Sequence, residues 1–250
     1  MYYSRKLKKF KNIRHCFFSK KGGFSKGLYK SLNCGKGSND EKKKILKNLK
    51  IVADKMNVKP SHLVLMNQSH SNKVKIINKR NFRRKINSDA IITKINGLSL
   101  GVLTADCVPI LLYDDSNKVI ACIHAGWRGA LSGIIRNTIN KIRNMNIKNN
   151  LFACIGPCIG GKNYEVDLKF YKKFISRSKK YKIYFSNKTK IKKLFNLRNF
   201  VADRLLELEV KVDHVKFDTF SEKNIFFSYR RSKVLKQKDY GRCISTIKLI

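Results

Sequence analysis

Six short apolar runs lie close together in the first half of the sequence, and they constrain the fold more than any other feature. Each is rich in β-branched residues and bounded by Asn, Asp or Gly, which is typical of buried strands. The runs occupy residues 63–66, 74–77, 89–93, 98–104, 108–114 and 119–125. Helical patterns flank this cluster of strands. We therefore predict a mixed α/β protein with at least one large sheet.

The flanking segments alternate between helical and strand periodicity. A first helix is predicted over residues 40–56, with Asp40 and Glu41 in its first turn. After GWRG (126–129), a second helical face is marked by Leu131, Ile134, Ile135, Thr138 and Ile142. A third is marked by Leu197, Phe200, Val201, Leu205 and Leu208. Further strands are expected at 151–157 and near 210–217, 225–229 and 242–249.

The chain has 250 residues, enough for one large domain or two small ones. It shows no internal repeat and no low-complexity linker, and it contains only three prolines. We expect a single domain spanning residues 1–250.

A formal charge of +40 invites a nucleic-acid hypothesis, because clustered Lys and Arg bind phosphate. The basic residues are scattered, however, mostly beside Asn and Ile. Within residues 98–135, the only lysine or arginine residues are Lys118 and Arg128. This pattern indicates a lysine-rich solvent-exposed surface rather than specific nucleic-acid recognition. Weak, non-specific binding to polyanions is expected.

The cysteines and the hydropathy pattern indicate a cytoplasmic protein. Seven cysteines are spread without the spacing of a disulfide framework, so we expect reduced thiols. The basic N-terminal segment lacks the apolar stretch of a signal peptide. No apolar run reaches the ~18 residues of a membrane span, so no membrane association is expected.

Three polar residues interrupt the apolar strands at or near their ends: His70, Cys107 and His124. Strand ends can converge on one rim of a sheet, where sites are often built. Two imidazoles and a thiolate suit zinc, and three protein ligands leave a fourth position for water or substrate. Two other interpretations remain open. The residues can be ordinary packing, or Cys107 and His124 can form a metal-free nucleophilic dyad.

Other segments fit a polar pocket less specifically. Residues 20–35 include Gly22, Gly23 and Gly27 with Ser25 and Asn33. Such a loop can present backbone N–H groups to an anion or be a plain surface turn. Arg230 and Arg231 follow the strand expected at 225–229, and their planar forks suit phosphate. Cys154 and Cys158 lack nearby metal-binding partners, which predicts packing.

Six stretches, taken in order, resemble one family across nearly the whole chain: the YfiH-like, laccase-domain proteins, described as multicopper polyphenol oxidases and as purine nucleoside phosphorylases. The stretches are FFSKKGGFSKGLYKSLNCGKGSND (17–40), MNQSHSNKV (66–74), SDAIIT with LSLGVLTADCVPILLYD (88–93 and 98–114), IACIHAGWRGALSGII (120–135), CIGPCIGGKNYEV (154–166) and FFSYRRSKVLKQKDYGRCISTIKLI (226–250).

The resemblance implies a four-layered α/β/β/α sandwich with mixed sheets, a fold similar to that of a toxin-type cysteine hydrolase. It also implies that His70, Cys107 and His124 bind one Zn²⁺ per chain. Cu²⁺ is a possible occupant, because it binds nitrogen and sulfur ligands more tightly than zinc.

The family's activities imply phosphorolysis of adenosine, inosine, guanosine and S-methyl-5′-thioadenosine, with adenosine deamination at the same site. Cys107 and His124 are then the catalytic core. Lys20 and Arg230 are candidates for phosphate binding and catalysis, and Asn33 for a contact with substrate. The partners are purine nucleosides and phosphate, and we expect a monomer or weak homo-oligomer.

The chain departs from the family pattern at two places. Lys20 stands where the family usually has arginine, which keeps the charge but loses the bidentate fork. Asp218-Thr219 replaces a Cys-Thr pair. Two alternative functions remain: a hydrolase that edits peptidoglycan precursors, and a copper-dependent polyphenol oxidase. One His₂Cys group does not supply the several copper centres that a multicopper oxidase needs.

Overall fold

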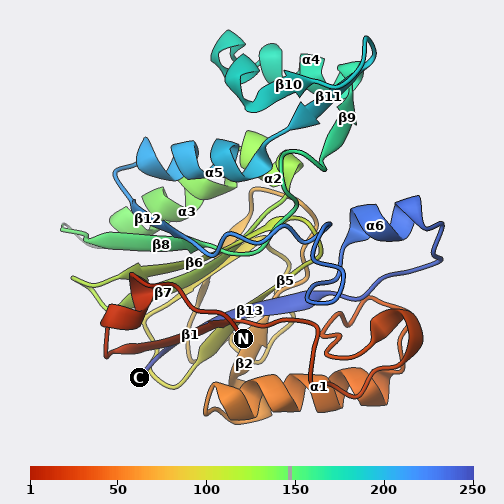
Figure 1. Ribbon diagram of the computed structural model, residues 1–250. Coiled ribbons are helices and arrows are strands. Elements are labelled where there is room, and N and C mark those ends of the chain that lie inside the picture. The colour runs from red at the N-terminus through yellow and green to blue at the C-terminus, as the bar shows by residue number, and fades with distance from the viewer. Residues whose placement is uncertain (146–147) are drawn as a thin grey trace.

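The computed structural model describes residues 1–145 and 148–250, and most of them form four layers (Figure 1). A six-stranded and a four-stranded sheet lie face to face. Helices α3 (Ile134–Arg143) and α5 (Leu197–Leu206) cover the outer face of the six-stranded sheet, and α1 (Lys42–Lys55) covers that of the four-stranded sheet. The predicted α/β/β/α sandwich with mixed sheets is therefore confirmed.

The six-stranded sheet has the order β12-β8-β6-β7-β4-β3. Its edge pairs β12·β8 and β3·β4 are parallel and its inner pairs antiparallel. Every residue of the central β6 and β7 is buried, as their apolar sequences predict. The strands are β3 (Val74–Ile77), β4 (Ala90–Thr93), β6 (Val108–Asp114), β7 (Val119–Ala125), β8 (Leu151–Ile155) and β12 (Lys211–His214).

The four-stranded sheet has the order β1-β13-β5-β2. Its strands are β1 (Ile13–Phe17), β2 (Leu63–Leu65), β5 (Ser99–Thr104) and β13 (Cys243–Leu249). No strand was predicted at β1, because Arg14 and His15 break its apolar pattern. Tertiary pairing with β13 forms the strand nevertheless.

Three apolar clusters match the layers. One lies between the sheets and includes Phe17, Leu100 and Tyr113. A second lies under α3 and α5, and a third under α1. Gly156 permits close packing, because a Cβ there would lie 2.3 Å from the Phe17 ring.

Residues 165–195 form a small lobe that projects beside α5 (Figure 1). It holds the three-stranded sheet β10-β11-β9 and helix α4 (Leu168–Ile175). The strands are β9 (Glu165–Asp167), β10 (Phe185–Asn187) and β11 (Lys192–Phe195). The sequence did not reveal this lobe, because its strands of three or four residues are too short to show periodicity. Stacked phenylalanines hold it together, among them Phe185 and Phe195 at 4.7 Å.

Three sequence predictions need correction. Asp40 and Glu41 do not lie in the first turn of α1, because the helix begins at Lys42. The strand expected at 225–229 is absent, because residues 225–228 are irregular and Tyr229 is the first residue of α6 (Tyr229–Val234). Ser228 caps this helix by accepting a hydrogen bond from Arg231 N. The helical face expected from Leu131 is split, because Gly133 adopts φ 91° between α2 (Trp127–Leu131) and α3.

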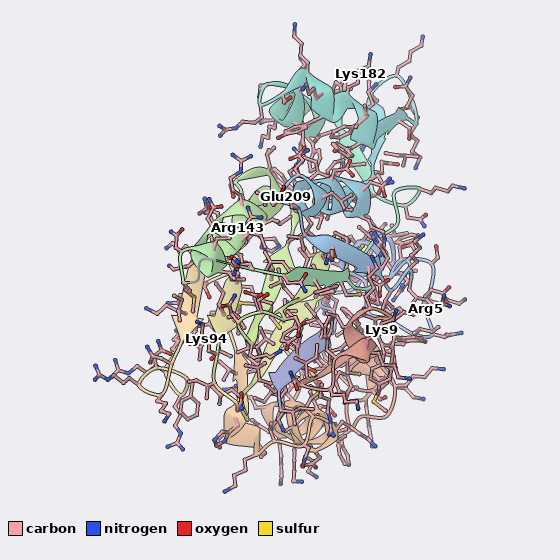
Figure 2. All side chains as sticks on the ribbon, turned by 90° about the vertical axis from the view of Figure 1, so that its left-hand side faces the viewer. Arg5, Lys9, Lys94, Arg143, Lys182 and Glu209 are labelled. Atoms are coloured by element: carbon pink, nitrogen blue, oxygen red, sulfur yellow. The ribbon has the colours of Figure 1, made fainter. Side chains whose placement is uncertain are left out.

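Positive charge is spread over the surface, as expected. Figure 2 shows nitrogen-tipped side chains on every part of the face that it presents, including Arg5, Lys94, Arg143 and Lys182. Within the described residues, no helix has the length and apolarity needed to cross a bilayer.

We expect His15 to make the fold sensitive to acid. Its side chain is buried, and Nε2 accepts a hydrogen bond from Ser4 N at 2.9 Å. Burial lowers the pKa of His15 to about 4, against an opposing effect of Asp213. The unfolded imidazole therefore gains a proton at higher pH than the folded one. The stability from this residue is complete above about pH 6.5 and lost as pH falls toward 4, a change of about 3 kcal/mol.

Urea unfolding at pH 7 and pH 4.5 measures this effect. His15→Gln keeps an uncharged acceptor and should flatten the loss of stability between the two pH values. A variant that loses as much stability as the wild type would contradict the assignment.

Candidate metal centre

Three strand ends bring His70, Cys107 and His124 to one edge of the six-stranded sheet. Cys107 directly precedes β6. His124 is the penultimate residue of β7, which runs antiparallel to β6, so that Pro109 pairs with His124. His70 precedes β3, which reaches the same edge through β4. The register of the sheet thus assembles residues that are distant in sequence.

The three side chains form one compact group. Their ligand atoms all lie within 4.8 Å of one another. Cys107 Sγ is 3.7 Å from His70 Nε2, and the two imidazole rings meet edge to face at 4.8 Å. His124 is buried, Cys107 is half-buried and His70 is exposed. The group is therefore closed on one side and open on the other.

Asp89 orients two of the three residues. Its carboxylate is fully buried and lies 2.8 Å from His124 Nδ1. It also accepts hydrogen bonds from the backbone N–H groups of His70 (2.9 Å) and Ser71 (2.7 Å). A proton held on Nδ1 leaves His124 Nε2 free as a ligand atom, which is the usual carboxylate–histidine arrangement at metal sites.

Burial and mutual interaction shape the charges of the group. Burial raises the pKa of the Cys107 thiol, but the two histidines, His124 above all, reverse this and bring it to about 7. Burial lowers the pKa of His124, yet Cys107 and Asp89 raise it to about 9. For Asp89, hydrogen bonds from His124 and Ser71 outweigh burial and hold its pKa below its usual range. The site therefore favours a thiolate.

Gly126 gives the group its space. A Cβ at this position would lie 2.6 Å from His70 Cδ2 and 3.0 Å from Cys107 Sγ. Only a residue without a side chain leaves both ligands in place. Glycine is therefore needed at this position of the HAGW motif so that His70 and Cys107 can pack against the backbone.

Asp106 connects the group to α6. It adopts φ 88°, and its buried carboxylate accepts hydrogen bonds from Thr219 Oγ1, Ser228 Oγ and Arg230 N. Burial raises the pKa of Asp106 despite these bonds. The residue beside Cys107 therefore fixes the position of Arg230.

A cavity of about 410 Å³ borders the group, and we call it the aromatic cavity. His70 and Cys107 line it together with Trp127, Tyr164, Phe170, Tyr229 and Arg230. The Arg230 guanidinium lies over the Tyr164 ring at 5.4 Å and donates a hydrogen bond to Glu165 O. The cavity offers aromatic faces and a cation next to the candidate ligands.

The donor set fits a metal ion of the zinc type. Two imidazole nitrogens and one low-pKa thiolate are typical zinc ligands, and three of them leave a position open. The Asp89 contact and the space beside Gly126 suit such an ion. We infer that these residues can hold one metal ion.

The structure separates the other predicted site residues. Lys20 lines a different cavity, with Lys21, Lys30 and Arg231, which contains none of the three ligand residues. Arg231 is occupied there by hydrogen bonds to the backbone carbonyls of Thr219, Phe220 and Phe226.

Asn33 is fully buried in the loop before α1. Its amide donates to Ser38 Oγ and Asp40 Oδ2 and accepts from Gly35 N and Arg242 N. In this packing it has no free hydrogen-bonding group for a substrate, so it supports the loop.

Cys154 and Cys158 are buried, and burial raises the pKa of both thiols, in agreement with a packing role. Sequence reasoning missed Asp89, Asp106 and Gly126. Asp89 looked like a strand boundary, because only the β4·β7 register places it beside His124.

We expect Asp89→Asn to weaken metal binding by about 10- to 100-fold, because the amide cannot fix His124 and the His70 backbone as the carboxylate does. Chelator competition measures this affinity. Asp114→Asn is the matched control: Asp114 is a buried carboxylate at the opposite end of β6 that accepts Ser116 N and Asn150 N. It should lower stability but leave metal affinity unchanged, and equal affinity in the two variants would contradict the role of Asp89.

Comparison with known proteins places the chain in a family. A family model described as multi-copper polyphenol oxidoreductase laccase matches residues 14–250. A purine nucleoside phosphorylase of Rickettsia prowazekii is 39% identical over 70% of this chain and 72% of its own length. One from Haemophilus influenzae is 31% identical over 88% of this chain and 90% of its own.

Solved structures of similar proteins share the fold of this chain. A Neisseria meningitidis protein has a TM-score of 0.86 and 28% identity, covering 96% of this chain and 95% of its own. Bacillus licheniformis YfiH has a TM-score of 0.88 and 25% identity, covering 95% and 93%. The chain therefore belongs to the multi-copper polyphenol oxidoreductase laccase family, which the resemblance to YfiH-like proteins predicted.

Proposed function

We propose that this protein is a zinc-dependent purine nucleoside phosphorylase that acts on adenosine, inosine, guanosine and S-methyl-5′-thioadenosine, and that it deaminates adenosine at the same site. The observation that carries the proposal is the His70–Cys107–His124 group opening on the aromatic cavity. The relatives named purine nucleoside phosphorylase support the reaction class.

The aromatic cavity suits a purine. Its volume of about 410 Å³ lies in the range of small-molecule sites. Trp127, Tyr164 and Phe170 supply flat apolar faces on which a base can stack. A base held there brings the ribose close to Cys107 and His70.

Arg230 is the phosphate ligand that the geometry supports best. Its guanidinium can bind a phosphate through two parallel hydrogen bonds. Asp106 holds its backbone, and the ring of Tyr164 supports its side chain. For Lys20 we propose the same role, although it lines a separate cavity. The Lys20 ammonium offers a point charge to phosphate, and a loss of phosphorolysis in Lys20→Ala would support this role.

A zinc ion held by His70, Cys107 and His124 would supply Lewis-acid chemistry at its open position. The protein's own residues prepare that position. The histidines favour the Cys107 thiolate, and Asp89 accepts the Nδ1 proton of His124, so that Nε2 is the nitrogen left to bind a metal. Trp127 and the lobe residue Phe170, whose rings lie 4.8 Å apart, exclude water from one wall of the cavity.

The alternatives have less support. Copper-dependent oxidation of phenols needs several metal centres, and His70, Cys107 and His124 are the one candidate ligand group found among the described residues. A cell-wall hydrolase with Cys107 as nucleophile is favoured by its thiol pKa of about 7. The hydrolase hypothesis predicts that thiol reagents inactivate the protein and that it does not turn over purine nucleosides.

Product analysis tests the proposal. The metal-loaded protein is given adenosine with and without phosphate, and the products are separated by chromatography. Adenine that forms only with phosphate supports phosphorolysis, and inosine formed without phosphate supports deamination. No turnover of any purine nucleoside would overturn the proposed function and favour the hydrolase.

A further inference from the structure

A second cavity, of about 590 Å³, borders the candidate metal ligands and shares His70 and Cys107 with the aromatic cavity. His124 also lines it. We call it the basic cavity, because five of its lining residues are cations: Lys36, Arg83, Arg84, Lys85 and Arg242. These cations come from three separate segments: the loop before α1, the β3–β4 loop and the start of β13.

The cations of the basic cavity are not balanced by acidic residues in its lining. No Asp or Glu is among its lining residues. Across residues 1–145 and 148–250, none of its five cations forms an ion pair with a carboxylate. Like charges gathered around a hollow produce a positive potential that attracts an anionic group.

The composition of the β3–β4 loop differs from the general lysine excess of the chain. Three of the 14 arginines in the sequence lie within residues 80–84, and residues 55–88 contain no acidic residue. Arg83 and Arg84 are exposed, and the Arg83 guanidinium packs on the Phe82 ring at 5.0 Å. Arginine forks match the oxygens of a phosphate, which scattered lysines do not.

The aromatic and basic cavities meet at His70 and Cys107, so one bound molecule can extend into both. We propose that the basic cavity binds the phosphate groups of a phosphorylated nucleoside whose base occupies the aromatic cavity. The proposal rests on the proposed function for the position of the base. It extends the substrate class to nucleotides.

Two features favour an attached phosphate over free inorganic phosphate. The cations are distributed over three segments around a cavity larger than the aromatic one, which suits a chain of phosphates. Free phosphate already has a candidate ligand in Arg230, which lines only the aromatic cavity of the two.

Calorimetric binding to the metal-loaded protein tests the proposal. The probes are inosine, inosine 5′-diphosphate and pyrophosphate, at one fixed salt concentration and without inorganic phosphate, so that neither phosphorolysis nor deamination occurs. Arg83→Ala/Arg84→Ala removes two charges from the basic cavity. Lys42→Ala/Lys43→Ala removes two charges from the exposed start of α1 and is the matched control.

We expect the wild type and the control to bind the diphosphate about tenfold or more tightly than inosine, because charge-assisted hydrogen bonds to phosphate are strong. The Arg83/Arg84 variant should bind both nearly equally. If it keeps the full preference, the proposal is overturned, since the diphosphate then binds elsewhere, for instance at the metal.

Two other outcomes also decide the question. If the diphosphate has no advantage over inosine, and the Arg83/Arg84 variant instead raises the KM for inorganic phosphate in phosphorolysis, the cavity serves free phosphate and the proposal is overturned. If pyrophosphate binds in an Arg83/Arg84-dependent way while inosine does not bind, the proposed function fails and the phosphate site alone stands.

Discussion

Cys107→Ala is expected to remove metal binding and to lower phosphorolysis by about 10³-fold or more. The variant leaves two imidazoles and no thiolate, and three ligands are the minimum that catalytic zinc sites use. The metal's contribution to charge stabilisation is several kcal/mol, which corresponds to at least about three decades of rate. Metal content by mass spectrometry of the native protein and adenine release with phosphate measure the two effects.

Cys158→Ala is the matched control for this prediction. Cys158 is also buried near the site, since Cys107 and Asp106 act on its pKa, but burial raises that pKa to about 11 and it is not a member of the ligand group. The control should keep both metal and activity. Loss of activity in Cys158→Ala alone would place the chemistry elsewhere.

His70→Ala separates the metal account from the metal-free dyad. A nucleophilic Cys107–His124 pair needs no second imidazole, whereas a metal centre loses a ligand. The metal account predicts that His70→Ala loses metal and activity as Cys107→Ala does. An active, metal-free His70→Ala enzyme would favour the nucleophilic cysteine.

Gly126→Ala is expected to weaken metal binding by about 10- to 100-fold without removing any ligand. The added Cβ would lie 2.6 Å from His70 Cδ2 and 3.0 Å from Cys107 Sγ, so both side chains must move. Overpacking of this kind costs about 1–3 kcal/mol, and each ~1.4 kcal/mol is a factor of ten in affinity. The backbone itself accepts alanine, because φ is −72° and ψ is 164°. Chelator competition again gives the affinity.

Gly133→Ala provides the opposite case. A Cβ at Gly133 meets no atom within 4 Å, but its φ of 91° disfavours any L side chain. It should lower the free energy of unfolding by about 1 kcal/mol and leave metal affinity unchanged. If Gly126→Ala matches Gly133→Ala in both the free energy of unfolding and metal affinity, the space that Gly126 leaves beside His70 and Cys107 does not contribute to metal binding.

The layered core was predictable because its central strands are buried on both faces. All six apolar runs correspond to β2 to β7. The signal is clearest for β4 to β7, where nearly every residue is buried. Strands with mixed composition were not predictable. β1 carries Arg14 and His15, and the lobe strands have only three or four residues, so that pairing partners rather than local sequence determine them.

The candidate metal ligands were visible as polar residues at or near the ends of apolar strands, whereas the residues that support them were not. Asp89 acts through a register that only the folded sheet defines, and Gly126 through a contact with His70. Lys20 and Arg230 look equally suited to phosphate in the sequence. Tertiary structure separates them, because the Asp106 carboxylate holds Arg230 beside Cys107 while Lys20 lines another cavity.

We expect one metal ion, bound by His70, Cys107 and His124, to support phosphorolysis of purine nucleosides. Titration of the metal-free protein with zinc, followed by adenine release from adenosine, tests it most directly. We predict that activity rises linearly, reaches its plateau at about one zinc per chain and requires phosphate throughout. Activity that is independent of added metal, or a plateau only at several metal ions per chain, would contradict the account.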